Sequence, residues 1–224
     1  MLNPLRNQQR SMQLMASILL CLLGGSAWAG FVTTNEKDLD AIFSQSAFRT
    51  PIDVRFNPTV TMSRPDLLTI NTEQQLNTLF DLGDNIPTID IFFVDAINEC
   101  GGDLSPLIIG CGDLSGNKIV VKSSFAAGVF GAALMGHELG HNLGLGHVDF
   151  PPANLMNPTL NGSIALTTSQ PNTILGSPDV QIGPGGAHFI LITPFAIVPE
   201  PATMLFALAG AVWLLQRARR RPPA

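Results

Sequence analysis

Apolar and polar residues between positions 30 and 197 follow patterns that predict several short strands. Residues 88–94 are mostly apolar over the length of a strand and predict the best buried strand of the chain. Residues 51–56 alternate between apolar and polar types, and 67–70 form a second short candidate. Residues 118–122 have an apolar centre between two lysines, which is typical of an edge strand. These segments predict a sheet.

Helical periodicity and capping residues predict the helices. One helix is expected within 35–48, and a second after Asn71 or Thr72, either of which can cap it. The segment from about 126 to 143 predicts a long helix whose first half is small and apolar on all sides, and therefore buried. A last helix is expected within 164–174, and Pro171 restricts where it begins.

Strands followed by a central helix indicate an α/β (α+β) layer with that helix beneath the sheet. Residues 30–197 suffice in length for one domain with its own core. Residues 148–158 contain several prolines and predict irregular backbone, 183–186 predict a loop, and 189–197 predict an extended segment.

The N-terminal 29 residues have the pattern of a secretory signal peptide. Arg6 and Arg10 precede an apolar stretch, and Ala27-Trp28-Ala29 matches a small-residue cleavage site. We therefore expect cleavage before Gly30 and export through the inner membrane. The alternative is an uncleaved membrane anchor, for which the apolar run is short.

Residues 198–224 have three parts: Pro-Glu-Pro at 199–201, an apolar run over 202–215, and an arginine cluster at 217–221. This arrangement resembles the PEP-CTERM sorting tail of Gram-negative bacteria. The resemblance implies recognition by an exosortase, cleavage near the Pro-Glu-Pro, and delivery to the cell surface or the extracellular polysaccharide matrix. The alternative is a plain transmembrane helix with a basic stop, which leaves the Pro-Glu-Pro unexplained.

The charge is distributed unevenly along the chain. The formal net charge is -5, with 12 Lys and Arg residues against 17 acidic residues. Half of the basic residues lie within 1–10 and 217–224, whereas all 17 acidic residues lie within 30–201. Such an acidic body repels phosphates and argues against nucleic acid as a partner.

Candidate chemistry is concentrated between residues 137 and 147. His137 and His141 are four residues apart, so on a helix both imidazoles face one metal ion. Gly144 tolerates the left-handed backbone that ends helices, which allows His147 to return as a third ligand. Three protein ligands with one open position are the pattern of catalytic zinc sites. Glu138 is adjacent to the first ligand and can reach a water molecule there.

This segment resembles the metzincin metalloendopeptidases, whose signature H-E-x-x-H-x-x-G-x-x-H is followed by a methionine turn. Every signature position matches, and Met156 follows the third histidine where the family places its structural methionine beneath the zinc. The sequence around His141 is most similar to that of the reprolysin branch. Val148 departs from the aspartate that reprolysins carry there, and the absence of tyrosine departs from the astacins.

The resemblance implies a metzincin-like fold: a small twisted mixed sheet over a central active-site helix, then a short irregular C-terminal subdomain. It implies Zn²⁺ held by His137, His141 and His147. Glu138 would be the catalytic base, taking a proton from a zinc-activated water. Strand 118–122 would be the sheet edge that pairs with extended substrate.

Two functions are therefore open. The first is a secreted or surface zinc endopeptidase that acts on protein or peptide substrates. The second is a matrix or adhesion protein that holds zinc on the same scaffold without meaningful turnover. Glu138 favours the first, because a site that only binds metal does not need it.

Cys100 and Cys111 are the cysteines that remain after signal removal, and they bracket a glycine-rich loop. Export places them in an oxidising compartment, so we expect a disulfide. The alternative is two free thiols.

Overall fold

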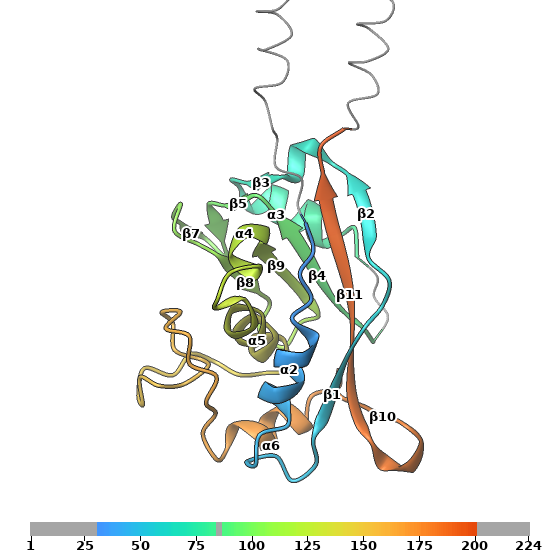
Figure 1. Ribbon diagram of the computed structural model, residues 1–224. Coiled ribbons are helices and arrows are strands. Elements are labelled where there is room, and N and C mark those ends of the chain that lie inside the picture. Colours follow the sequence, from blue (N-terminus) through green and yellow to red (C-terminus); the bar gives the residue numbers. More distant parts are fainter. Residues whose placement is uncertain (1–30, 84–86, 201–224) are drawn as a thin grey trace, which may run out of the picture.

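The computed structural model describes residues 31–83 and 87–200, and this part is built around one mixed sheet (Figure 1). Along the five-strand path of this sheet, neighbouring strands run parallel except at one end, where the last strand is antiparallel. The mixed α/β class expected from the sequence is confirmed. The strands are, in spatial order, β1 (Ile52–Phe56), β11 (His188–Val198), β4 (Ile89–Val94), β9 (Lys118–Lys122) and β8 (Gly110–Gly112).

The long strand β11 holds the sheet together, although it is the last strand in the sequence. It pairs in parallel with β1 on one side and with β4 on the other (Figure 1). Two short strands, β2 (Val60–Ser63) and β10 (Gln181–Ile182), also pair with β11. The segment that the sequence predicted only as extended is therefore a central strand.

Helices cover both faces of the sheet, which explains why every residue of β4 is buried. Ile91 and Phe93 of β4 belong to the core shared with α2 (Glu36–Phe43) and α5 (Gly131–Asn142). Phe92 and Val94 point to the opposite core, which includes Leu76 and Leu79 of α3 (Glu73–Phe80). The strand predicted at 88–94 is confirmed.

The prediction that Lys118–Lys122 is an edge strand is wrong. This strand, β9, lies between β4 and β8, and the edge belongs to β8. Both of its lysines have partners within the chain: Lys118 Nζ lies 2.6 Å from Asp90 Oδ2 in a buried ion pair, and Lys122 Nζ donates to the Pro106 carbonyl at 2.9 Å in an exposed hydrogen bond. The flanking charges therefore serve internal contacts and do not protect an exposed edge.

The long helix predicted from about residue 126 to 143 is interrupted. A short helix, α4 (Ser123–Ala126), ends in a turn, and α5 begins at Gly131. Gly128 N–H donates to the Phe125 carbonyl and Gly131 N–H to the Gly128 carbonyl, both at 2.9 Å, which closes this turn. Gly131 also passes so close to the Ala126 carbonyl that a Cβ there would overlap it. The glycines thus redirect the chain between two helices.

The other predicted helices are present in shorter form. The first spans Glu36–Phe43 and follows Asn35, whose side chain donates to the Ala126 carbonyl and does not cap the helix. Thr72 caps α3 as expected, since its Oγ1 accepts the Gln75 N–H. The last helix, α6, is limited to Gln170–Leu175. Short elements complete the fold: η1 (Pro65–Leu67), β3 (Thr69–Ile70), β5 (Ala96–Ile97), β6 (Glu99–Cys100), β7 (Asp103–Leu104) and η2 (Pro184–Gly186).

The C-terminal region differs from the expected short irregular subdomain. Residues 148–169 are irregular, but the chain then passes through α6 and β10 and returns into the sheet as β11. Within the described residues, no helix is long and apolar enough to cross a membrane. The predicted signal peptide (1–29) and all of the predicted tail after residue 200 lie outside the described residues.

Candidate metal centre

Helix α5 brings together two of the three predicted metal ligands and the predicted base. His137, Glu138 and His141 lie in its second half, where the backbone is regular. The rings of His137 and His141 are edge to face with centroids 4.8 Å apart, as the i, i+4 spacing predicts. Both side chains therefore point to the same side of the helix.

The helix ends as the sequence predicted, at Gly144. Its φ of 90° lies in the left-handed region that favours glycine. Gly144 N–H donates to the His141 carbonyl at 2.9 Å, and Leu145 N–H donates to the Gly140 carbonyl at 2.8 Å. These bonds satisfy the last helical carbonyls and turn the chain back. His147 then lies against the helix, with its ring centroid 4.7 Å from that of His141.

The three imidazoles converge through their Nε2 atoms. His141 Nε2 lies 3.2 Å from the Nε2 of His137 and 3.2 Å from the Nε2 of His147. The Nδ1 atoms of the two helical histidines face carbonyl oxygens, that of Leu155 at 2.7 Å and that of Leu145 at 2.8 Å. A carbonyl can only accept, so each of these Nδ1 atoms carries the proton and each Nε2 presents a lone pair.

Lone pairs that face one another at this distance repel unless a cation lies among them. Nitrogen ligands at about 2.0–2.1 Å in a tetrahedron are spaced by roughly 3.3–3.4 Å, close to the observed separation. Metal-bound histidines usually donate their other ring N–H to a carbonyl, as His137 and His141 do here. The three histidines therefore fit a tetrahedral metal ion such as zinc.

Burial keeps the helical histidines neutral. It lowers the pKa of His137 to about 4, an effect that the nearby His141 and His147 increase and the Leu155 carbonyl opposes. Burial also lowers the pKa of His141, again against the effect of its carbonyl partner. Neutral imidazoles are the form that binds metal.

Glu138 lies on the same helix but faces the edge strand β8. Its side chain is enclosed, and burial raises its pKa to about 8, opposed by a hydrogen bond from the Gly112 N–H. A Cβ on Gly110 would overlap the Glu138 carboxylate, and one on Gly112 would lie 2.8 Å from the Glu138 carbonyl oxygen. The two glycines of β8 therefore allow the helix to pack closely enough to enclose this carboxylate.

The predicted methionine turn packs against a glycine face of α5. Met156 is fully buried, and a Cβ on Gly140 would lie 2.5 Å from its sulfur. A Cβ on Gly136, one turn earlier, would contact the side chain of Leu155 at 3.5 Å. Because Gly136 and Gly140 have no side chains, the Leu155–Met156 segment can pack directly against the helix that carries the histidines.

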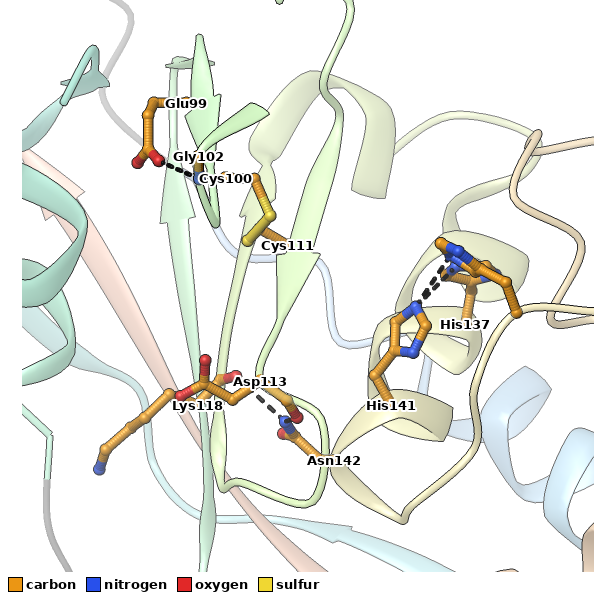
Figure 2. The surroundings of a disulfide bond; sticks show 10 residues. Glu99, Cys100, Gly102, Cys111, Asp113, Lys118, His137, His141 and Asn142 are labelled. Carbon is orange, nitrogen blue, oxygen red and sulfur yellow. Dashed lines mark hydrogen bonds between the residues drawn. A yellow bond between two sulfur atoms is a disulfide. The ribbon is translucent and has the colours of Figure 1, made fainter. Parts of the chain in front are cut away.

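A cleft of about 910 Å³ runs past these groups. Its walls include the three histidines, Glu138 and the whole of β8, and apolar side chains such as Leu134 and Leu160 line it. The structure joins Cys100 and Cys111 in a disulfide, which ties β8 to β6 along the cleft. Figure 2 shows this disulfide on the strand beside the helix that carries His137 and His141.

Sequence reasoning missed several residues that shape the site. Gly110 and Gly112 form the real edge strand, yet a Gly-Cys-Gly segment has no strand pattern. Gly136 and Gly140 had a usable signal, because glycine inside a helix costs about 1 kcal/mol relative to alanine and often marks a close contact. Asn154, which is buried beside Met156, had no signal in the sequence.

No family model matches the chain, and searches of curated proteins and of solved structures found no significant match.

Proposed function

We propose that this protein is a zinc-dependent endopeptidase of the metzincin type. The observation that carries this proposal is the presence, in one cleft, of three convergent imidazole Nε2 atoms and a buried carboxylate. The imidazoles would hold zinc, and the carboxylate has the position and environment of a general base. Glu138 is enclosed by two glycines of the edge strand, an arrangement that a metal-storage site does not require.

Zinc held by the three histidines would polarise a peptide carbonyl and acidify a water molecule. Glu138 would accept the proton of the attacking water on its carboxylate and then pass it to the leaving nitrogen. A pKa raised by burial suits both steps, because a carboxylate that holds a proton near neutral pH is a stronger base than a solvated one. Gly112 N–H would keep one carboxylate oxygen in place.

The outer edge of β8 would bind the substrate. This edge faces the cleft, and no other strand in the described part of the chain pairs with it. An extended peptide can add to such an edge through main-chain hydrogen bonds, which would lay its scissile bond beside the histidines. The role that the sequence assigned to 118–122 thus passes to Gly110–Gly112.

The test is hydrolysis by the purified full chain. We expect cleavage of casein, loss of cleavage with a chelator, and recovery when zinc is restored. Protein that binds one zinc per chain but cleaves nothing in a broad peptide library would contradict the proposal. That result would support the matrix or adhesion protein that binds zinc without turnover.

We further propose that the protein is exported and that an exosortase sorts it to the cell surface or the extracellular polysaccharide matrix. Strand β11 ends at Val198, and Pro199 and Glu200 follow it directly, so the proposed cleavage point lies just outside the sheet. Mass spectrometry of the extracellular protein should find a chain that begins at Gly30 and ends near residues 199–201. A full-length chain retained in the cytoplasm would contradict this.

A further inference from the structure

Two buried carboxamides, Asn154 and Gln170, bind each other behind the methionine turn. Asn154 Nδ2 donates to Gln170 Oε1 at 3.0 Å, and Gln170 Nε2 donates back to Asn154 Oδ1 at 3.2 Å. Each oxygen also accepts a backbone N–H, that of Met156 at 2.9 Å and that of Thr167 at 2.7 Å. Asn154 is 1% exposed and Gln170 is 6% exposed. Burying polar groups is costly unless they are bonded, so this arrangement requires a reason.

We infer that this amide pair is a positioning element for the metal centre, which holds the Leu155–Met156 peptide and through it His137 and His147. The inference rests on the proposed zinc site. Asn154 and Gln170 contact no metal or substrate in this scheme, and they act only through the peptide that they hold.

The connection to His137 is a single peptide plane. The N–H of the Leu155–Met156 peptide donates to Asn154 Oδ1, and the C=O of the same peptide accepts the Nδ1 proton of His137. Because a peptide group is rigid, fixing its N–H also fixes the direction of its C=O. Asn154 therefore sets the ring orientation of His137 and keeps its proton on Nδ1.

The connection to His147 runs through the next carbonyl. Met156 C=O accepts the N–H of Val148 at 2.8 Å, and Val148 directly follows His147. The same held segment thus anchors the chain on both sides of the site, at the helix and at the returning loop. His147 lies outside regular secondary structure, and the hydrogen bond between Val148 and Met156 supports its backbone instead.

A carboxamide is required at position 154 because it must accept from one partner and donate to another. An alanine does neither. Glutamate at position 170 keeps acceptors for Asn154 Nδ2 and the Thr167 N–H, but when ionised it cannot donate to Asn154 Oδ1. Asn154→Ala is therefore the stronger disruption and Gln170→Glu the milder one.

The experiment measures metal binding by the full chain, independently of hydrolysis. The zinc dissociation constant is determined against a chromophoric chelator, and the absorption spectrum of the cobalt-substituted protein reports ligand geometry. We expect Asn154→Ala to weaken zinc binding by about 10–100-fold, the usual effect of removing a group that orients a ligand, and to alter the cobalt bands. Gln170→Glu should cause a smaller change in the same direction.

Asn161→Ala is the matched control. Asn161 is in the same irregular region, donates to the Pro152 carbonyl at 2.6 Å and accepts the Ser163 N–H at 2.8 Å, but it is exposed and has no bond to the methionine turn. We expect zinc affinity and the cobalt spectrum to be unchanged in this variant. If Asn161→Ala weakened zinc binding as much as Asn154→Ala, the inference would be overturned, because any hydrogen bond in this irregular region would then have the same effect on the metal centre.

A second result would also overturn it: Asn154→Ala with an unaltered zinc constant and cobalt spectrum but a lower unfolding temperature, which would mean a purely structural role. If Asn154→Ala does not fold, Gln170→Glu decides by the same criteria. Failure of the unsubstituted protein to bind zinc would remove the proposed function together with this inference. Equal zinc binding by the unsubstituted protein, Asn154→Ala and Gln170→Glu would contradict this inference but leave the proposed function standing.

Discussion

His137 and Glu138 lie on a helix beneath the sheet, 8% and 6% exposed, whereas His147 lies on the exposed chain beyond the helix end. On the helical side, regular backbone and close packing against β8 fix the side chains. On the loop side, the chain is held by individual hydrogen bonds, in which Val148 N–H donates to the Met156 carbonyl and Met156 N–H donates to Asn154 Oδ1. One candidate site therefore combines two kinds of support.

This difference in support predicts whether a substitution affects stability, chemistry or both. On the helical side, a proposed metal ligand and the proposed general base are themselves buried, so a substitution there should affect both stability and chemistry. On the loop side, the ligand can be removed without disturbing the core.

The largest effect is expected from Glu138→Gln on the helical side. Glutamine has the same shape but cannot accept a proton, so turnover should fall by about 10²–10⁴-fold. Zinc content should remain at one per chain, because Glu138 is not among the three proposed ligands. Hydrolysis rate and bound zinc are measured on the same sample, with Glu36→Gln on the exposed face of α2 as the control. Cleavage at the unsubstituted rate would refute the role of Glu138.

The next largest effect on turnover is expected from one of two glycine substitutions, one on each side of the site. Gly110→Ala should place a methyl group against the Glu138 carboxylate, whereas Gly146→Ala on the loop side meets nothing within 4 Å. We expect Gly110→Ala to lower turnover by about 100-fold, since a displacement near 1 Å can cost that much. Gly146→Ala should retain the original rate. Steady-state hydrolysis tests both, and equal rates in the two variants would show that β8 does not set the position of Glu138.

Removal of single histidines should distinguish the two sides by stability. His137→Ala leaves the buried Leu155 carbonyl without its donor, so metal-free protein should lose about 1–3 kcal/mol of unfolding free energy. His147→Ala alters an exposed position and should change that free energy by less than about 0.5 kcal/mol. Urea unfolding in chelator gives both values, and zinc binding should be weakened in both variants. Equal destabilisation would contradict the comparison.

The smallest effect is a pH dependence confined to the helical side. The pKa of Glu138 is raised to about 8 in the folded protein, so between pH 6.5 and 7.5 the folded state binds more protons than the unfolded state. Glu138 alone should therefore lower the unfolding free energy of the metal-free protein by about 1 kcal/mol as pH rises over this interval, and the protons that His137 binds only in the unfolded state offset part of this fall. His137, whose pKa is lowered to about 4, is neutral throughout it in the folded state.

Glu138→Gln is the control for this pH effect. Its unfolding free energy should not fall between pH 6.5 and 7.5, because the titrating group is gone. Urea denaturation at the two pH values, for both proteins in chelator, measures the difference. A parallel decline in the two proteins would assign the effect to other groups.

The sequence predicts those parts of the fold whose signals are local. The apolar run of β4, the Thr72 cap of α3 and the Gly144 helix end depend on neighbouring residues, and each is found where expected. The convergence of the three histidines could also be predicted from local spacing, because helical geometry and one left-handed glycine bring them to the same side of the helix, whereas their support by the Leu155–Met156 segment could not.

The remaining parts depend on contacts between distant segments. Strand β11 contains Pro194, which lacks the N–H that a central strand normally donates, and nothing nearby indicates that it pairs with β1 and β4. The edge strand β8 is recognisable only from the helix that packs on it. Asn154 and Gln170 are ordinary polar residues in the sequence, and only the folded chain brings them together.

The position of β11 also determines the order in which this protein can assemble. In the proposed export from the N-terminus, β1, β4 and the histidine helix would emerge long before β11, the strand that lies between β1 and β4. Ile190 and Ile192 of β11 belong to the same core as Leu134 and Leu139 of α5. The apolar core beneath this helix is therefore incomplete until β11 joins the sheet. Closure of the sheet is a late, long-range event. Any activity of the site would therefore begin only after nearly the whole chain has left the cytoplasm, which would protect the cell that makes it.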